Sequence, residues 1–326
     1  MTSPEGPQRS CTPAGRPWRL APGQVWSPVP SAPSLTRVRA RAPASSANLG
    51  PGFDVLAVAV DRYVEVEVEL ADKLTVRSEG EGAGLADDAG HLAARVAMDV
   101  AGHDRLAITV RSAIPIARGL GSSAALAVAA AAAAGADDPL AVAARVDGHP
   151  ENAAASVYGG LVVAAPVRGA VQVVRLPLDP ALAFVAAVPD RSLPTARARL
   201  ALPDRVSRED ATFNLGRLGF LLAGLADHRQ LVREAAEDRL HQDYRSPLFP
   251  EAPKLLGALQ AGGALAACWS GAGPTLLGIC RRADAPSVVT AARSALVEAG
   301  VPGRVLVLRP DLQGLVTGEG ARIPAG

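Results

Sequence analysis

The sequence predicts an α+β fold built from two domains, and three observations lead to this expectation. Segments such as "YVEVEVEL" (residues 63–70) alternate strictly between apolar and polar residues, which is typical of half-buried antiparallel strands. Strand-like and helix-like segments follow one another without a regular βαβ repeat. The length of 326 residues suits one large or two medium domains. We expect domains over residues 36–178 and 179–326.

Residues 1–35 precede these domains and differ from them in composition. They are rich in Pro, Ser and Gly and carry two isolated tryptophans, Trp18 and Trp26. Such a composition cannot easily bury a core. We therefore expect a disordered tail without a function of its own.

The first predicted domain mixes strands with helices whose ends are marked by particular residues. The helix expected over residues 91–102 is closed by Gly102. A later helix begins with Asp137 or Asp138 as its N-cap and has Pro139 in its first turn. The expected strands are "RVRARA", "YVEVEVEL", "RLAITVRS", "GGLVVAAPV" and "VQVVRLPL".

The second predicted domain begins with a strand, "LAFVAAVP". A Gly-rich turn separates two further strands within "ALAACWSGAGPTLLGIC", and "RVLVLRP" is expected to be the last strand. The expected helices are "ATFNLGRLGFLLAGLAD", "RQLVREAAEDRLHQ", "EAPKLLGALQAGG" and "PSVVTAARSALVEAG".

Composition excludes several classes of partner. The net charge of +1 provides no field that would attract nucleic acid or a membrane surface, and the 3% of aromatic residues provide no stacking platform for single strands. Cys11, Cys268 and Cys280 form neither a CxxC pair nor a zinc-binding spacing. The apolar run over residues 124–134 is too short to span a bilayer, and no signal peptide is apparent. We expect a cytoplasmic protein that binds small molecules, with no membrane or nucleic-acid partner.

The stretch "PIARGLGSSAALAVAAAAAAG" (residues 115–135) has the chemistry of a phosphate-binding loop. Gly119 and Gly121 precede a helix, whose first N–H groups carry partial positive charge that a close anion can reach. Ser122 and Ser123 add hydroxyls suited to phosphate or to a magnesium ion. From the loop alone, a simple turn before a packed alanine helix remains an alternative.

Two common nucleotide-binding motifs do not fit this stretch. The Walker A loop needs a lysine, but Lys73 and Lys254 are the only lysines and neither follows a glycine loop. A dinucleotide-binding pattern is matched by Gly119, Gly121 and Ala124, yet "AIPIAR" separates these glycines from the preceding strand. The protein-kinase signatures HRD and DFG are absent from the sequence.

Three stretches taken together resemble a known family. They are the loop "PIARGLGSSAA", the segment "PASSANLGPGFDVLAVAV" (residues 43–60) and the segment "DGHPENAAASVYGG" (residues 147–160). The stretches "VPDRSLPTARARLALP", "FNLGR", "DRLHQDYR" and "SGAGPT" follow in the same order as in that family. Over about residues 36–310 the sequence resembles the homoserine kinases of the GHMP kinase superfamily.

The resemblance implies a fold and an activity. It implies an N-terminal mixed α/β domain and a ferredoxin-like C-terminal domain, with the active site between them. It also implies ATP-dependent phosphorylation of the L-homoserine hydroxyl in threonine biosynthesis. The ATP-binding residues it implies are Pro115, Ile116, Ala117, Arg118, Gly119, Leu120, Gly121, Ser122, Ser123, Ala124 and Ala125.

Homoserine is a zwitterion with one primary alcohol, so a specific site needs a cation for its carboxylate and an anion for its ammonium group. At the matching positions, Arg199 and Arg245 would bind the carboxylate and Asp54 would face the ammonium. Asn48 and Asn152 would bond the polar groups of the substrate. The same residues could also serve as ordinary turn or surface residues.

The expected reaction is in-line attack of the hydroxyl on the γ-phosphorus, for which positioning and charge neutralisation suffice. We assign the catalytic roles to Asn152 and Arg199 and a further substrate contact to His149, which lies beside Asn152. We assign no strong general base, because none of these residues has to take that role.

Magnesium is the expected metal, held by Ser122, Ser123 and Asp147. Here the sequence departs from the family, which usually places a glutamate on the helix before the HPDN-like segment. The acid near that position is Asp147, and Glu151 replaces the usual aspartate.

Another small-molecule kinase of the superfamily, acting on mevalonate or a sugar, and a non-catalytic ligand sensor remain alternatives; a homodimer is left open.

Overall fold

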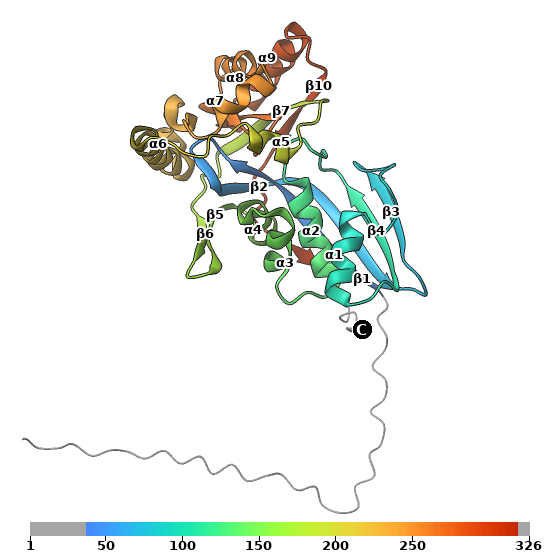
Figure 1. Cartoon of the computed structure of the whole chain (residues 1–326). Helices are drawn as coiled ribbons and strands as arrows, with labels where there is room; N and C mark the ends of the chain where they lie inside the picture. Colours follow the sequence, from blue (N-terminus) through green and yellow to red (C-terminus); the bar gives the residue numbers. More distant parts are fainter. Residues whose placement is uncertain (1–36, 319–326) are drawn as a thin grey trace, which may run out of the picture. The chain divides into compact units, whose positions relative to one another are not determined.

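The computed structural model describes residues 37–318, so the predicted tail over residues 1–35 and Cys11 lie outside the described residues. The first of its two sheets has seven strands (Figure 1). Five of them follow the order β11-β1-β2-β4-β3, while β5 pairs with the N-terminal part of β2 and β6 pairs with β5. These strands are β1 (Arg37–Asn48), β2 (Gly52–Leu70), β3 (Thr75–Gly80), β4 (Leu106–Ser112), β5 (Leu161–Val167), β6 (Ala170–Leu176) and β11 (Val316–Thr317).

The period-two pattern predicted half-buried antiparallel strands correctly in β1 and β2, which pair with each other. The two strands are antiparallel, and Val64, Val66 and Val68 point into the core as the alternation requires. Glu67 is also buried, because Arg37 and Arg39 both donate hydrogen bonds to its carboxylate. Burial opposes ionisation of Glu67, but the two arginines outweigh it and keep the pKa of this carboxyl below its ordinary value.

Four helices cover one face of the first sheet (Figure 1). The alanine-rich α2 is buried on every side, since it packs against β1 and β2 and is flanked by the other three helices. Small side chains allow this close packing, and the expected core helix is confirmed. The helices are α1 (Leu92–Ala101), α2 (Ser122–Ala133), α3 (Pro139–Asp147) and α4 (Pro150–Tyr158).

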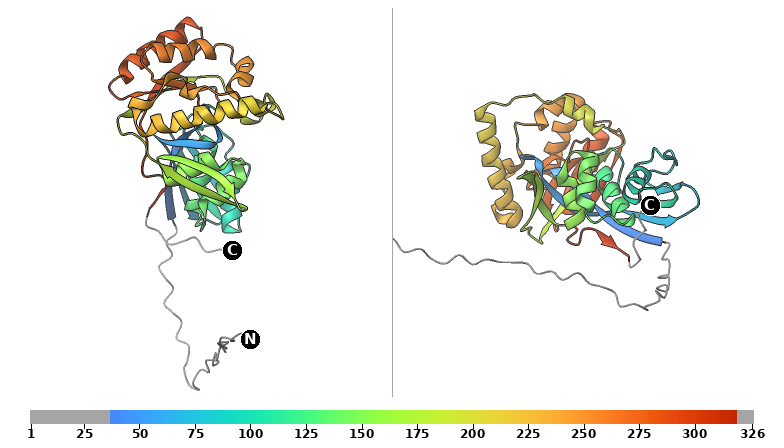
Figure 2. Two further views of the ribbon diagram at one scale, coloured as in Figure 1. Left: turned by 90° about the vertical axis from the view of Figure 1, so that its left-hand side faces the viewer. Right: turned by 60° about the horizontal axis from the view of Figure 1, so that its bottom comes forward.

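The second sheet has the order β10-β7-β9-β8, and α8 and α9 pack side by side against it (Figures 1 and 2). Apart from the helical elements between β7 and α8, this part runs strand, helix, strand, strand, helix, strand along the chain, and the spatial order places the first and third strands in the centre. This is the expected ferredoxin-like arrangement. Its elements are β7 (Leu182–Pro189), α8 (Ala252–Ala261), β8 (Ala266–Trp269), β9 (Leu276–Arg281), α9 (Ala285–Glu298) and β10 (Gly303–Leu308).

The helix predicted over "RQLVREAAEDRLHQ" is wrong. After α6 (Arg208–Ala226) the chain forms only short turns of helix, because Asp227 and Asp238 each accept backbone N–H groups and begin new turns. These short elements are η1 (His228–Gln230), η2 (Arg233–Ala236), α7 (Gln242–Arg245) and η3 (Ser246–Leu248).

The strand "RVLVLRP" is not the last one, which corrects a second expectation. The chain continues past β10, and the two-residue β11 pairs with β1 of the first sheet. The elements β3, α4 and α5 (Thr195–Leu200), the last of which lies between β7 and α6, were not predicted from the sequence. Within residues 37–318, no helix combines the length and apolarity needed to cross a membrane. The domain boundary near residue 178 stays a prediction.

Candidate active site

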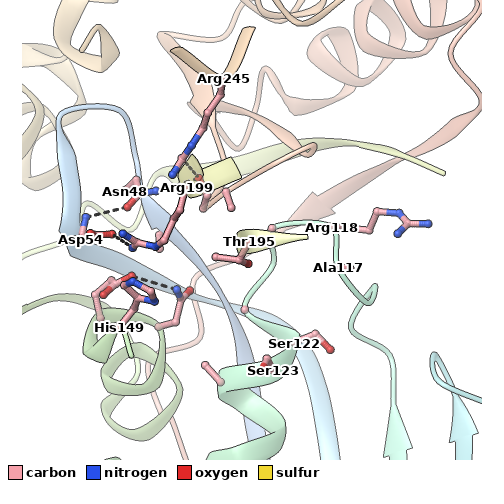
Figure 3. A pocket seen from close by; sticks show the side chains of 18 residues that line it. Asn48, Asp54, Ala117, Arg118, Ser122, Ser123, His149, Thr195, Arg199 and Arg245 are labelled. Atoms are coloured by element: carbon pink, nitrogen blue, oxygen red, sulfur yellow. Dashed lines mark hydrogen bonds and ion pairs between the residues drawn. The ribbon is translucent and has the colours of Figure 1, made fainter. Parts of the chain in front are cut away.

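A cavity of about 110 Å³ opens where the loop before α2 meets the end of β1, the start of α5 and the turn between β8 and β9 (Figure 3). Most of the predicted site residues line it, although they come from distant parts of the chain. These are Asn48, Asp54, Ala117, Arg118, Gly119, Gly121, Ser122, Ser123, Ala124, His149, Asn152, Arg199 and Arg245.

Four residues of the predicted ATP-binding stretch do not line this cavity. Leu120 and Ala125 are buried in the core beneath the loop. Pro115 and Ile116 instead line a neighbouring cavity of about 540 Å³, which shares Ala117 and Arg118 with the first one. The predicted stretch therefore divides between two adjoining cavities and the core.

The loop presents the start of a twelve-residue helix to the cavity. Gly121 is the N-cap of α2 in a left-handed conformation, and no side chain of the described residues caps the helix. Ser122, Ser123 and Ala124 form its first turn at the cavity wall. Uncapped N–H groups at a helix start attract anions.

Three consecutive carbonyls of this loop are held by donors from the second half of the chain. A carbonyl fixed in this way also fixes the direction of its peptide N–H, because the peptide unit is planar. The loop is therefore held in one orientation before any ligand binds. The bonds run from Leu193 N to Ala117 O (3.3 Å), from Thr275 N to Arg118 O (3.3 Å) and from Ser270 Oγ to Gly119 O (2.6 Å).

Glycine is required at two positions of the loop. Gly119 and Gly121 both have positive φ, at 77° and 65°. A Cβ on Gly119 would lie 2.2 Å from the carbonyl oxygen of Ser270, and one on Gly121 would lie 2.1 Å from Ser45 Oγ. Neighbouring protein atoms thus demand these glycines independently of any ligand.

The side chain of Arg118 does not serve the cavity. Its guanidinium donates to the carbonyls of Ile116 (2.9 Å), Pro189 (2.8 Å) and Asp190. Figure 3 shows it pointing away from the other labelled side chains. Arg118 thereby ties the loop to the end of β7.

Charged side chains form the opposite wall. Arg199 and Asp54 form an ion pair at 2.6 Å, and one third of each side chain is exposed. Asn48 accepts the backbone N–H of Asp54 at 3.0 Å and donates to the carbonyl of Gly271 at 2.9 Å. Asn48 and Asp54 have φ values of 71° and 56°, a conformation that side-chain-bearing residues adopt mainly where surrounding contacts impose it.

Arg245 is the most deeply buried charge of the site, with 1% of its surface exposed. Its Nη1 donates to Gly271 O and to His241 Nδ1, both at 2.9 Å, while its Nε has no partner in the described part of the chain. Burial, with the nearby charge of Arg199, lowers the pKa of Arg245 to about 10. The guanidinium stays cationic at neutral pH and retains unused capacity for an anion.

Asn152 is held in one orientation at the start of α4. Its Oδ1 accepts from Ser45 Oγ at 2.8 Å, and its Nδ2 donates to Glu151 Oε1 at 3.2 Å. His149 precedes α4 and lies on the same side of the cavity (Figure 3). The sequence prediction missed the neighbouring Thr195, although "SLPTARARL" had been matched as a motif.

The site offers oxygen donors for a metal ion beside the loop. Ser122, Ser123 and Glu151 line the cavity. Hydroxyl and carboxylate oxygens are suitable ligands for Mg²⁺, so the residues fit the expected ion. The third predicted ligand, Asp147, ends α3, but its side chain lies outside the described part of the structure.

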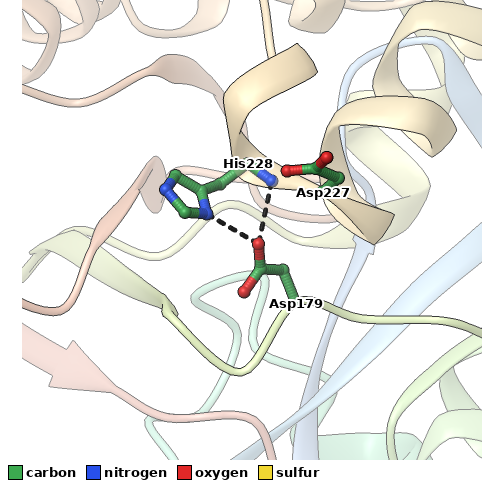
Figure 4. A group of neighbouring side chains, drawn as sticks. All are labelled: Asp179, Asp227 and His228. Atoms are coloured by element: carbon green, nitrogen blue, oxygen red, sulfur yellow. Dashed lines mark hydrogen bonds and ion pairs between the residues drawn. The ribbon is translucent and has the colours of Figure 1, made fainter.

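A second group of potential metal ligands, Asp179, Asp227 and His228, lies outside this cavity (Figure 4). Asp179 accepts from the backbone N–H and from Nδ1 of His228, the latter at 2.6 Å, and these bonds lower its pKa to about 2. Asp227 accepts from both the backbone and the guanidinium of Arg229. These hydrogen bonds explain why the three side chains lie together: they stabilise the turn that follows α6.

Comparison with known proteins agrees with the fold and with the family resemblance. Residues 88–160 match the family model of the GHMP kinase N-terminal domain, and residues 221–298 match that of the GHMP kinase C-terminal region. Homoserine kinases from Moorella thermoacetica and Thermus thermophilus are 38% and 41% identical to this chain. The matches cover 85% and 82% of this chain, and 98% and 94% of those proteins.

A solved structure gives the same result. The crystal structure of homoserine kinase from Cytophaga hutchinsonii superposes with a TM-score of 0.77 at 26% identity, over 90% of this chain and all of that one. The resemblance first seen in three sequence motifs thus extends over the whole described fold. The chain belongs to the homoserine kinase family of the GHMP kinases.

Proposed function

We propose that this chain transfers the γ-phosphate of ATP to the hydroxyl of L-homoserine, forming O-phospho-L-homoserine for threonine biosynthesis. One observation carries the proposal: a single cavity has a phosphate-binding helix start on one wall and a matched cation and anion on the other. A phosphate donor and a zwitterionic acceptor can therefore meet there. The relatives at 38–41% identity are homoserine kinases, which supports the same assignment.

The amino-acid end of the substrate replaces the ion pair between Asp54 and Arg199. In our proposal its ammonium group takes the place of Arg199 beside Asp54, and its carboxylate binds Arg199 and the buried Arg245. The exchange keeps every charge paired, which limits the cost of breaking a bond of 2.6 Å. Galactose carries neither charge, and mevalonate carries a carboxylate but no ammonium group for Asp54, so the proposal favours homoserine over both.

ATP binds along the loop in this proposal. Its phosphates lie against the N–H groups of residues 119–123, and its base enters the adjoining cavity of about 540 Å³ beyond Ala117 and Arg118. Ser122, Ser123 and an acidic side chain would hold Mg²⁺, with Asp147 predicted from the sequence and Glu151 already at the cavity wall. The ion would neutralise charge on the phosphate oxygens.

Catalysis then depends on placing the hydroxyl in line with the γ-phosphorus. Asp54 is engaged with charged groups throughout, so we assign it no proton-abstracting role. Asn152 is locked by Ser45 and Glu151 and is proposed to orient the hydroxyl. Arg199 binds the substrate and adds positive charge near the transferred group.

We further propose a cytoplasmic enzyme that needs no membrane or nucleic acid. The net charge of +1 supports this, because it provides no long-range attraction to either. A homodimer is the assembly to examine by light scattering.

The direct test measures ADP release with homoserine, mevalonate and galactose in parallel, each with ATP and magnesium. We expect release with homoserine to exceed release with the other two by at least about 100-fold, since only homoserine completes the charge exchange. Absence of ADP release with millimolar homoserine would contradict the proposed function.

A further inference from the structure

His241 is wholly buried immediately before α7, four residues ahead of Arg245. Its Nδ1 lies 2.9 Å from Arg245 Nη1, and its Nε2 lies 2.9 Å from the carbonyl oxygen of Gly50. A guanidinium can only donate, and a carbonyl can only accept. These partners assign the imidazole proton to Nε2 and leave Nδ1 as an acceptor for Arg245.

The surroundings favour a neutral imidazole. Burial lowers the pKa of His241; Asp238 raises it, with its carboxylate 3.5 Å from Nε2, and Arg245 lowers it further. An imidazolium would place a proton against the guanidinium and lose the bond to it. The neutral Nε2–H form satisfies both neighbours.

Phe53 extends this contact to the other side of the site. Its ring stacks on His241 with centroids 5.2 Å apart, and the guanidinium carbons of Arg199 and Arg245 each lie 5.6 Å from its centroid. Phe53 directly precedes Asp54 in the chain. The ring of Phe53 therefore contacts all three side chains, those of Arg199, Arg245 and His241.

The hydrogen bond from His241 to the carbonyl of Gly50 links His241 to a second part of the site. Gly50 belongs to the three-residue turn that joins β1 to β2, between Asn48 and Asp54. A Cβ on Gly50 would lie 2.2 Å from the carbonyl oxygen of Ala236, so this turn is tightly packed against the segment before α7. His241 thus bonds both the buried arginine and the turn that precedes Asp54, the anionic residue of the site.

We propose that His241 is a positioning residue that holds the guanidinium of Arg245 and the turn preceding Asp54 at one fixed spacing, so that the carboxylate and the ammonium of an amino-acid substrate bind together. This inference deepens the proposed function and depends on it for the identity of the substrate. An ordinary buried histidine would stabilise the fold without favouring one end of the substrate over the other.

Two substitutions separate the two bonds of the imidazole. His241→Asn places an amide oxygen near the position of Nδ1 and can still accept from Arg245, but it does not reach Gly50. His241→Gln places an amide nitrogen near the position of Nε2 and can still donate to Gly50, but it leaves Arg245 without its acceptor. His91→Gln is the matched control, because His91 is also buried but lies outside the cavity, where it caps α1.

Two competitive inhibitors then report on each end of the substrate. 4-Hydroxybutyrate keeps the carboxylate of homoserine and lacks its ammonium, whereas 3-aminopropan-1-ol keeps the ammonium and lacks the carboxylate. In His241→Gln we expect the KM for homoserine and the inhibition constant of 4-hydroxybutyrate to rise about tenfold, the cost of one hydrogen bond to a charged group. The inhibition constant of 3-aminopropan-1-ol and the KM for ATP should stay within about twofold.

His241→Asn should show the opposite preference, weakening 3-aminopropan-1-ol more than 4-hydroxybutyrate, because the turn preceding Asp54 has lost its bond. His91→Gln should change neither inhibitor. Equal weakening of both inhibitors in His241→Gln, or no weakening of either, would overturn the proposal.

A spectroscopic measurement keeps this test independent of the proposed function and of any variant that fails to fold. In the ¹⁵N-histidine-labelled full chain at neutral pH without substrate, His241 should show a protonated Nε2 and an unprotonated Nδ1. The Nδ1 resonance should shift in Arg245→Met. A protonated Nδ1, or no shift, overturns the proposal, whereas an inactive wild-type chain with the expected resonances contradicts only the assignment of homoserine.

Discussion

The two walls of the cavity are built from different materials. The loop wall is main chain, glycine and small hydroxyls, all within residues 117–124. The opposite wall is charged side chains that come from the start of β2, α5 and α7. The first wall depends on backbone geometry, and the second depends on individual side chains and on what surrounds them. Mutations should therefore damage the two walls in different ways.

The largest effect is expected from Gly119→Ala. Its φ of 77° and the Ser270 carbonyl, 2.2 Å from a built Cβ, leave no room for a methyl group, so the loop must shift. A shift of about 1 Å at a reacting centre costs about 100-fold in rate, and we expect kcat/KM for ATP to fall at least that far. Steady-state kinetics would check this.

Gly169→Ala is the matched control for that substitution. Gly169 also has positive φ, at 83°, but a Cβ there meets no atom within 4 Å. It should cost stability without changing kcat/KM. Equal losses of activity in both variants would show that strain alone, and not the loop, causes the damage.

Arg245→Ala should have the next largest effect and should be confined to the other substrate. It removes a charged hydrogen-bond donor with 1% exposure, a loss of about 1.5–3 kcal/mol, or about 10- to 100-fold in kcat/KM for homoserine. The KM for ATP should change little, because the loop wall is intact. Arg229→Ala, at an exposed ion pair, serves as the control; equal damage to both substrates in Arg245→Ala would identify a merely structural arginine.

Ser270→Ala is expected to have a smaller effect, and on the loop wall. The substitution removes the donor to Gly119 O at 2.6 Å and the hydroxyl partner of Ser46. The loss of one hydrogen bond of about 1 kcal/mol should raise the KM for ATP about fivefold. Thr275→Val in the same turn is the control, because its buried hydroxyl has no hydrogen-bond partner in the described residues and should tolerate a methyl group. An unchanged KM for ATP in Ser270→Ala would mean that the carbonyl bond does not position the loop.

The smallest effect is a pH dependence of folding stability that arises from His241, behind the charged wall. Because the pKa of buried His241 lies below the ordinary value, the unfolded chain binds a proton that the folded chain does not, and stability falls as pH drops below about 6.5. One group contributes at most about 1.4 kcal/mol per pH unit. Chemical denaturation between pH 7 and 5 should show a steeper loss in the wild-type chain than in His241→Asn. Parallel curves would mean that His241 is not held neutral.

The same contrast explains what the sequence could and could not predict. The loop wall is contiguous, so "GLGSSAA" identified it as a candidate, although a simple turn before a packed helix remained an alternative from the loop alone. The strict alternation in β2 and the Asp138 and Pro139 start of α3 were predicted correctly. Asp54 and Arg199 are 145 positions apart, and only the family resemblance suggested that they share a site. Their pairing depends on tertiary packing, which no local pattern encodes.

The errors have physical causes as well. The segment after α6 has helical periodicity, but Asp227 and Asp238 accept backbone N–H groups and divide it into short turns. The role of His241 was invisible because a lone histidine in "DRLHQDYR" carries no signal of what it bonds. A buried polar contact is defined by its partner, and the partner here is supplied by a turn 191 residues away.

The turn between β8 and β9 touches both walls and therefore determines a length. Ser270 and Thr275 hold the loop carbonyls, while Gly271 accepts from both Asn48 and Arg245. The distance from the proposed phosphate subsite to the proposed amino-acid subsite is thus set by one short piece of backbone. Under the proposed function the enzyme therefore selects its acceptor by side-chain length. An acceptor shorter by one methylene places its hydroxyl about 1.5 Å too far from the phosphorus. Serine would then fill the charged subsite and still remain out of reach of the phosphate.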